Sequence, residues 1–148
     1  MRISAKGRYA LAAMIYMAAR YENGENISVI NISESLGISK IYLEQIFTVL
    51  KNRGLVRSVK GAAGGYVLTA SPKELTAYDI LLAVEPSLFE AVAATVQGSA
   101  PHIESAMQAL VFGKIDERLK GELNAVTLLK LAENAEFNKN PDYNMFYI

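Results

Sequence analysis

Apolar residues recur at helical spacing along most of the chain, and this pattern predicts a mainly α-helical fold with one small β-hairpin. Ser4 is placed to cap a helix over residues 5–21, which Asn23 and Gly24 end. The apolar residues expected on the buried side of this helix are Leu11, Ile15, Ala18 and Ala19. After a polar link, residues 27–29 predict a short strand.

Two short helices follow, over residues 29–36 and 40–52, with a three-residue turn between them. Gly37 can adopt the left-handed conformation that ends the first helix, and Ser39 can cap the second. Two short helices joined by a short turn that contains glycine are typical of the helix-turn-helix unit.

A β-hairpin is predicted directly after the second of these helices. Residues 55–59 alternate between apolar and polar as a strand does, and residues 66–69 form the return strand. The glycine-rich stretch 61–65 suits a loop that needs small residues, and its glycines would let the hairpin backbone approach a partner closely. A helix-turn-helix followed by such a wing predicts a winged helix-turn-helix domain over residues 1–75.

The second half of the chain, residues 76–148, is predicted to contain a short helix, a loop and then a long amphipathic helix. The short helix covers residues 77–84, and the small and polar residues 87–100 form the loop. Pro101 suits the first position of the long helix, which should run for about 23 residues and about 35 Å. A last short helix is expected near residues 128–135.

The long helix carries an apolar stripe that needs a partner. Its members are Ile103, Met107, Leu110, Val111, Ile115, Leu119 and Leu123. A second copy of the chain is the simplest surface on which to bury the stripe, so we expect a homodimer. The alternative is that the stripe packs on the chain's own core. Gly113 and Gly121 would allow close backbone approach across the dimer, and the apolar tail 145–148 is expected to dock.

Composition narrows the classes of function. The sequence contains no cysteine and one histidine, His102, which disfavours a thiolate-ligated metal, a zinc enzyme and a Ser-His-Asp hydrolase. No catalytic motif is recognisable, so we do not expect an enzyme. No apolar run approaches the roughly 20 residues of a membrane span, and the N-terminus does not look like a secretory signal. A cytoplasmic protein without membrane contact is therefore expected.

The zero net charge hides an asymmetry between the two halves. Residues 1–75 carry ten Lys or Arg and five Asp or Glu, a net of +5, whereas residues 76–148 carry five and ten, a net of −5. A basic half joined to an acidic half is typical of a protein that meets a polyanion at one end, and double-stranded DNA is the expected partner.

The N-terminal turn of a recognition helix reaches base edges in the major groove, and the wing reaches phosphates or the minor groove. The residues expected to contact DNA are Arg2, Lys6, Arg8, Ser39, Lys40, Tyr42, Glu44, Gln45, Arg57, Ser58, Lys60 and Gly61. Gln45 can pair bidentately with adenine, and Glu44 can accept from cytosine unless it is only a solvated helix charge. Tyr42 either reaches a phosphate or serves packing. A two-fold dimer would read a roughly palindromic operator.

Three stretches, residues 1–9, 42–45 and 54–66, resemble the family of small bacterial winged-helix repressors. That family includes the iron–sulfur cluster regulator IscR and the cysteine-metabolism regulator CymR, and the resemblance covers nearly the whole chain. It implies a dimeric DNA-binding regulator of transcription. Residues 121–128 look like the segment that ends the long helix of IscR, whereas residues 145–148 look more like the CymR type.

The resemblance also implies a place for a cofactor. IscR-type regulators hold a [2Fe-2S] cluster with three cysteines spaced Cys-x5-Cys-x5-Cys, in a sensor loop that corresponds to residues 87–106 here. Counting back from the shared segment places these positions at Ala94, Ala100 and Ala106, and the family's histidine ligand at Ala109. As sequenced, the chain therefore has no cofactor, and a [2Fe-2S] cluster is expected only in a cysteine-containing parent.

Two interpretations stay open. In the first, the alanines replace cysteines, and the chain is a cluster-free, apo-like regulator of iron–sulfur cluster biogenesis genes. In the second, the chain is a naturally cysteine-free regulator, CymR-like and concerned with sulfur or cysteine metabolism. A partner protein or a small ligand would then control it.

Overall fold

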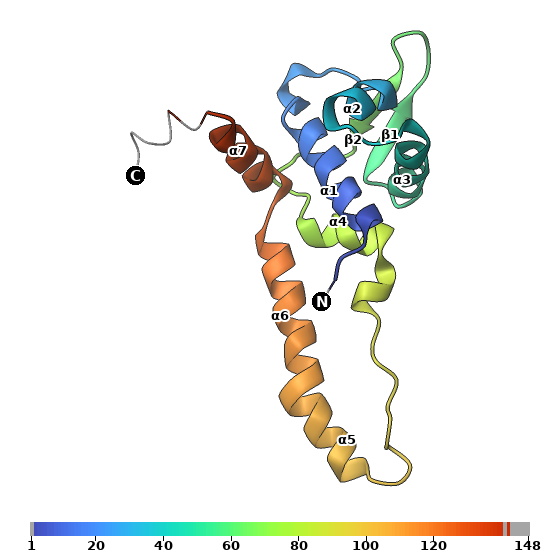
Figure 1. Ribbon diagram of the computed structural model, residues 1–148, viewed down its shortest axis with the longest axis vertical. Helices are drawn as coiled ribbons and strands as arrows, with labels where there is room; N and C mark the ends of the chain where they lie inside the picture. The colour runs from blue at the N-terminus through green and yellow to red at the C-terminus, as the bar shows by residue number, and fades with distance from the viewer. Residues whose placement is uncertain (1, 141, 143–148) are drawn as a thin grey trace.

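The computed structural model describes residues 2–140 and 142, which form a helical body and a long projecting arm (Figure 1). The body contains α1 (Ala5–Ala18), α2 (Val29–Leu36), α3 (Lys40–Asn52), β1 (Val56–Val59), β2 (Gly65–Leu68), α4 (Ala77–Val84) and α7 (Leu128–Lys139). The arm, residues 86–125, begins with a 3-10 turn (Pro86–Phe89) and a loop, and continues through α5 (Pro101–Met107), a π-helical turn (Gln108–Phe112) and α6 (Gly113–Ala125). The predicted fold class, mainly helical with a β-hairpin, is confirmed.

Helix α1 lies at the centre of the body, but its predicted length and buried side were partly wrong. The helix ends at Ala18, and a 3-10 turn (Tyr21–Asn23) leads to Gly24, which has a φ of 64°. The buried residues are Gly7, Ala10, Ala13, Met14, Met17 and Ala18. Leu11 and Ile15 are half-buried, and Ala19 is exposed. Because α1 is apolar around most of its circumference, periodicity does not single out one face, and the small residues let α4 and α7 pack closely.

The two helices of the helix-turn-helix have the predicted bounds. Gly37 ends α2 with a φ of 66°, and the Ser39 hydroxyl accepts a hydrogen bond from the Tyr42 amide at 3.3 Å. The predicted strand over residues 27–29 was wrong, because Ser28 already caps α2. What remains of it is a single bridge between Ile27 and Tyr66.

The wing is an antiparallel pair of strands, in which Val56 lies opposite Leu68 and Val59 opposite Gly65. A Cβ at Gly65 would lie 2.5 Å from the Ile27 carbonyl oxygen, so this glycine is needed for packing within the chain. The Tyr66 ring lies 4.7 Å from the ring of Phe47, which is fully buried in α3. The hairpin is thereby fixed to α3.

The core of the body also takes in parts of the second half of the sequence. The Ala77 amide donates to the Val126 carbonyl at 2.9 Å, and the Leu128 amide donates to the Leu75 carbonyl at 2.8 Å. These bonds place α7 beside α1, where Leu128 is fully buried. The hydrophobic core therefore extends beyond residues 1–75 into α4 and α7, and α7 is longer than the predicted helix near residues 128–135.

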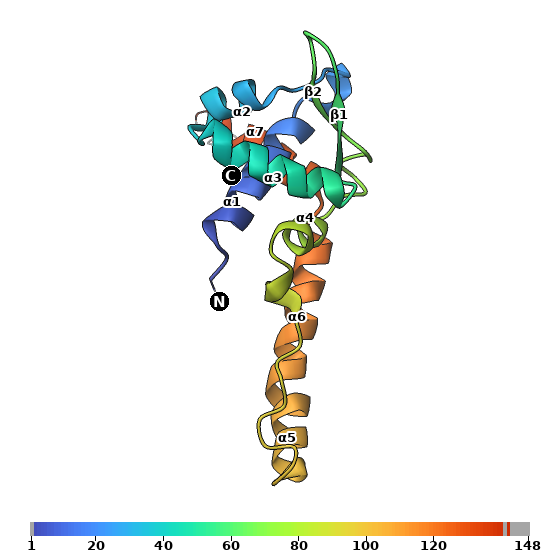
Figure 2. The same cartoon turned by 90° about the vertical axis from the view of Figure 1, so that its right-hand side faces the viewer.

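The predicted long helix runs without a break from Pro101 to Ala125, along the arm (Figure 2). Residues four apart on an α-helix differ by about 40° around its axis, so a plain i+4 stripe from Ile103 to Leu123 would turn by about 200°. The π turn takes up an extra residue and offsets part of that rotation. A Cβ at Gly113 would lie 2.7 Å from the Gln108 carbonyl oxygen, so this glycine serves the turn locally.

Within the described residues, no helix is both long and apolar enough to cross a membrane. The predicted docking of the tail, residues 145–148, lies outside the described part of the chain.

Candidate nucleic-acid interface

Helix α3 crosses one face of the body and presents an exposed stripe from its first three turns (Figure 2). The exposed residues of this stripe are Lys40, Ile41, Glu44, Gln45 and Thr48. The opposite side of α3 is fixed by Leu43, Phe47 and Leu50, which have no exposed surface. Ser39 is exposed, but its hydroxyl is engaged in capping the helix. A rigidly packed helix with a polar N-terminal half is the arrangement that reads base edges in a major groove.

Glu44 already has a partner in this stripe. Its carboxylate lies 3.7 Å from the Lys40 ammonium, and both side chains are 54% exposed. Exposed pairs of this kind contribute about 0–1 kcal/mol, so the pair opens readily. Within the described part of the chain, no ion pair or side-chain hydrogen bond engages Gln45, so its exposed amide can meet a base edge.

Tyr42 does not belong to the exposed stripe. It is half-buried, and its ring meets the Tyr9 ring edge-on at 5.4 Å. Lys6 lies one turn before Tyr9, on the same side of α1. The tyrosine pair therefore connects the N-terminal end of α1 to α3, so that Tyr42 serves packing whether or not it also reaches a phosphate.

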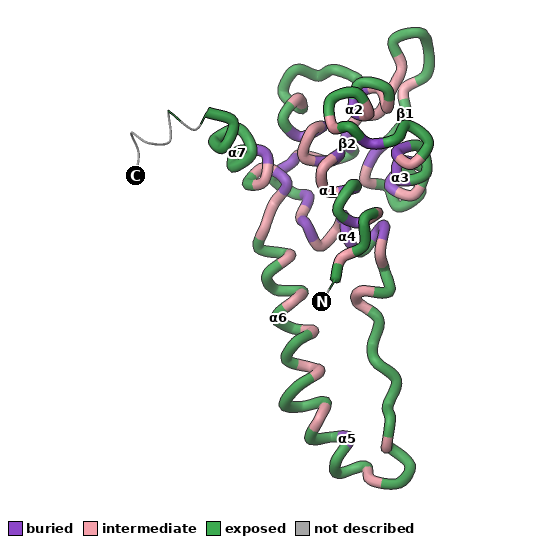
Figure 3. The backbone as a smooth tube through the Cα atoms, viewed as in Figure 1, coloured by how far each residue is buried: buried purple, intermediate pink, exposed green. Residues whose placement is uncertain are grey.

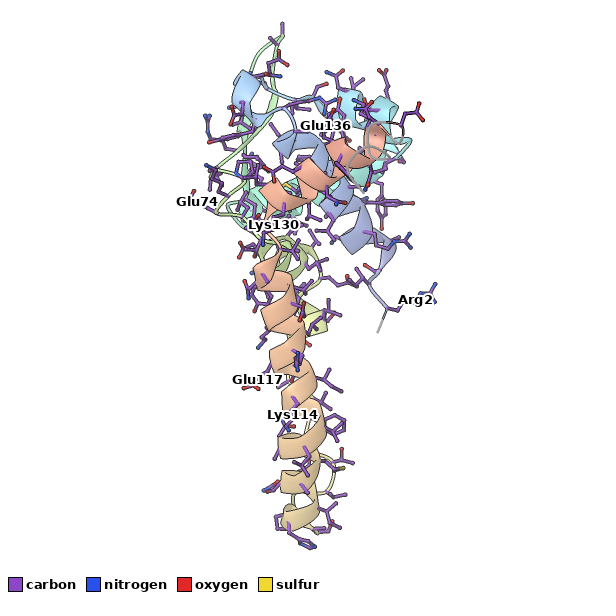
Figure 4. The ribbon with its side chains drawn as sticks, turned by 90° about the vertical axis from the view of Figure 1, so that its left-hand side faces the viewer. Arg2, Glu74, Lys114, Glu117, Lys130 and Glu136 are labelled. Carbon is purple, nitrogen blue, oxygen red and sulfur yellow. The ribbon has the colours of Figure 1, made fainter. Side chains whose placement is uncertain are left out.

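The start of α1 and the wing lie on different sides of α3 (Figure 2). The Ser4 amide donates to the Glu85 carboxylate at 3.0 Å, which ties the start of α1 to the end of α4. Arg2 and Arg8 are exposed, and Figure 4 shows Arg2 projecting from the body. Any contact of these cations with DNA is therefore separate from that of the wing.

The wing residues do not all point the same way. Ser58 lies opposite Tyr66 on the hairpin face that packs on α3, whereas Arg57 lies opposite Val67 on the other face. There Arg57 lines a hollow with Tyr21 and Glu25. Lys60 and Gly61 are exposed at the tip, where Gly61 has a φ of 113° that favours glycine.

Ile41 is a candidate contact that the sequence analysis missed. It is 70% exposed at the start of α3, among Lys40, Glu44 and Gln45. An exposed apolar side chain at that place suits the methyl group of thymine. Its position one helical turn before Gln45 was the available signal.

The positions that correspond to cluster ligands do not fit an iron–sulfur cluster. Ala94, Ala100, Ala106 and Ala109 offer methyl groups and no thiolate or imidazole. Among residues 2–140 and 142, no group of three or more His, Cys, Asp or Glu is arranged to hold a metal ion. Ala94 and Ala109 line one hollow, Ala100 directly precedes α5, and Ala106 is exposed within it.

The side chains of the predicted dimerisation stripe are exposed or half-buried, and Figure 3 shows the arm as mostly exposed. Ile103 is 49% exposed, Leu110 67%, Val111 46% and Ile115 57%. Met107, Leu119 and Leu123 are half-buried. A strongly apolar groove of about 570 Å³ runs along this side, lined by Leu110, Val111, Lys114, Ile115, Arg118, Leu119 and Glu122.

The fold and the exposed helix define a winged helix-turn-helix protein, and comparison with known proteins gives its family. Residues 3–134 match the model of the Rrf2 family, described as iron-dependent transcriptional regulators. The chain belongs to the Rrf2 family of transcriptional regulators. This confirms the resemblance on which the sequence analysis relied.

Named relatives point to two members of that family. The transcriptional regulator IscR of Klebsiella pneumoniae (strain 342) is 37% identical over 136 residues, which is 92% of this chain and 82% of that protein. The structure of CymR, the global cysteine regulator of B. subtilis, is similar with a TM-score of 0.74 and 34% identity, covering 90% of this chain and 98% of that one. The T. potens IscR structure has a TM-score of 0.70 and 31% identity, covering 91% and 88%.

Proposed function

We propose that this Rrf2-family chain is a homodimeric regulator that binds a roughly palindromic DNA operator through α3 and the wing. The observation that carries the proposal is the exposed stripe of α3, held by a buried apolar side and flanked by a wing with a free tip. Gln45 and Ile41 would meet base edges, and Lys60 would meet a phosphate. We assign no catalytic reaction to the chain.

The arm supports the dimeric part of the proposal. An uncovered groove lined by Leu110, Ile115 and Leu119 is unfavourable in water, because exposed apolar surface gains free energy on burial. Lys114, Arg118 and Glu122 at its edges carry both signs of charge, which suits the same surface on a second copy. Two copies joined along their arms would present two α3 helices, one to each half-site.

For the genes that are controlled, we propose those of iron–sulfur cluster biogenesis, regulated by a form without a cluster. Support comes from IscR relatives that are 36% to 37% identical over 92% of the chain. Because the sequence contains no cysteine, DNA binding by this chain should not depend on iron.

The second candidate is a CymR-like regulator of sulfur or cysteine metabolism that a partner protein or a small ligand controls. The similarity to CymR of B. subtilis along 98% of that chain favours it. The triple variant Ala94→Cys, Ala100→Cys and Ala106→Cys, purified without oxygen, separates the two candidates. A coloured protein with about two irons and two sulfides per chain supports the first. A colourless, folded, DNA-binding protein supports the second.

DNA binding itself is tested by fluorescence anisotropy with a labelled duplex at several salt concentrations. We expect roughly tenfold or greater loss of affinity between about 50 and 200 mM salt, because binding releases counterions from the phosphates. Lys60→Ala should weaken binding to every sequence and reduce the slope of log affinity against log salt by about 1. An affinity independent of salt, or absent at low salt, would refute the DNA-binding proposal.

A further inference from the structure

The hollow that Ala94 and Ala109 line lies in the arm, between the loop that precedes α5 and the start of the long helix. Its volume is about 450 Å³, within the range of about 300–1,000 Å³ typical of small-molecule sites. The residues that line it are Val92, Ala94, Gln97, Glu104, Ser105, Gln108 and Ala109. Figures 1 and 2 show the loop running alongside the helix here.

Glu104 holds this hollow together. Its carboxylate oxygen Oε2 accepts hydrogen bonds from the backbone amides of Thr95 at 3.0 Å and Val96 at 2.8 Å. These two bonds fasten the loop to α5. Glu104 is 8% exposed, which is exceptional among the charged residues of an otherwise solvated arm. Within residues 2–140 and 142, its other oxygen, Oε1, has no hydrogen-bond or ion-pair partner.

Among the described residues, no cationic side chain forms an ion pair with this carboxylate. None of the side chains that line the hollow is a lysine, an arginine or a histidine. A buried charge is normally paired, because leaving it without a counter-ion costs free energy. The rest of the lining offers two amides, from Gln97 and Gln108, and the Ser105 hydroxyl, which can each donate or accept a hydrogen bond.

We propose that the hollow binds a small organic cation, whose guanidinium or ammonium group pairs with Oε1 of Glu104. The polar part of such a molecule would meet Gln97, Ser105 and Gln108. The hollow shares no residue with the apolar groove of the dimerisation stripe, and in Figure 4 its loop lies behind the helix that carries the labelled Lys114. The hollow and the groove are therefore lined by different residues of the long helix. This site does not rest on DNA binding, and its test contains no DNA.

The probes are butylguanidine and butylurea, which have nearly the same shape and differ by one positive charge. Binding to the ¹⁵N-labelled full chain is followed by NMR titration of the Thr95 and Val96 amides, which donate to Glu104. We expect saturable shifts with butylguanidine, and at least about tenfold weaker binding of butylurea, because a charge-assisted hydrogen bond is lost.

Two variants locate the cation. Glu104→Gln keeps an oxygen that can accept from both amides but removes the charge, and it should weaken butylguanidine binding about tenfold or more. Ala109→Leu leaves Glu104 intact and fills the hollow, so it should also weaken binding. Glu117→Gln removes the same charge from an exposed position on α6 and should leave binding unchanged.

The proposal is overturned if butylguanidine gives no saturable shift with the unmodified chain, or if butylurea binds equally well. It is also overturned if Glu104→Gln and Ala109→Leu both bind butylguanidine as the unmodified chain does. Should Glu104→Gln unfold the arm, Ala109→Leu and the pair of probes still decide the question.

Discussion

Apolar residues recur at helical spacing in both the body and the arm, but they are buried in the body and largely exposed in the arm. In the body, Phe47, Leu50 and Ile80 have no exposed surface, whereas in the arm Leu110 is 67% and Ile115 57% exposed (Figure 3). The spacing of apolar residues thus predicts a helix and its apolar face. It does not predict which molecule covers that face. The body covers its apolar residues within one chain, whereas the described residues leave much of the arm's stripe exposed.

The largest effect is expected from a substitution in the buried core of the body. Phe47→Ala removes a fully buried ring that contacts Tyr66 of the wing, and should lower the free energy of unfolding by about 3–5 kcal/mol. Chemical denaturation measures the effect. Phe137→Ala is the control, because Phe137 is 45% exposed and its loss should matter little. A loss below about 1 kcal/mol for Phe47→Ala would show that the body does not depend on this core.

The next largest effect is expected from a substitution in the apolar groove of the arm, which should weaken the dimer and leave the body folded. Ile115→Glu places a charge in the apolar groove and should raise the dimer dissociation constant about 100-fold or more, which is about 2.7 kcal/mol. Sedimentation velocity over a range of concentrations measures it. Lys120→Glu introduces the same side chain on α6 outside the groove and should leave the dimer unchanged. A monomeric unmodified chain would instead contradict the dimer.

A smaller effect is expected from a substitution on the exposed stripe of α3, and it tests whether this helix reads a base. Gln45→Ala should reduce discrimination at one base pair of each half-site by about 1–3 kcal/mol, with the salt dependence unchanged. Competition between single-base operator variants measures this discrimination. Asn52→Ala, at the far end of the same helix, is the control and should change nothing. If the loss is uniform over all sequences, Gln45 does not read a base.

The smallest effect concerns the start of α4 in the body, where the Thr76 hydroxyl donates to the Asn124 side chain at the end of the arm at 3.4 Å. The Thr76 hydroxyl accepts from the Asp79 amide at 3.2 Å, and the Asp79 carboxylate accepts from the Thr76 amide at 2.9 Å. Thr76→Ala removes half of this capping box and should lower the free energy of unfolding by about 1 kcal/mol. Thermal unfolding detects it, with the exposed Ser99→Ala as a control. Equal stability of the two variants would mean that the cap contributes nothing.

The helix-turn-helix and the wing were predictable because local chemistry decides them. Ser39 caps α3, and Gly37 and Gly61 occupy backbone conformations that favour glycine. Such signals act within a few residues and do not depend on the rest of the fold. Two of the three stretches that carry the family resemblance, residues 42–45 and 54–66, lie in these units, and the Rrf2 match confirms the resemblance.

Other features depend on contacts between distant segments, which spacing alone does not reveal. The buried side of α1 was misjudged because alanine and methionine surround most of the helix, and only the approach of α4 and α7 selects a face. The π turn was missed because Gly113 looked like a dimer contact. Arg57 and Ser58 point to opposite faces of the hairpin, because side chains alternate along a strand. This difference could have been predicted from the sequence.

Selection of binding sites from a random pool of duplex DNA, with the unmodified chain, tests the central claim most directly. Two α3 helices on a two-fold dimer should enrich an inverted repeat, with half-sites separated by one or two helical turns of about 34–36 Å each. Enrichment of a single unrepeated half-site would contradict the dimer built on the arm. No enrichment at all would contradict the role given to α3 and the wing.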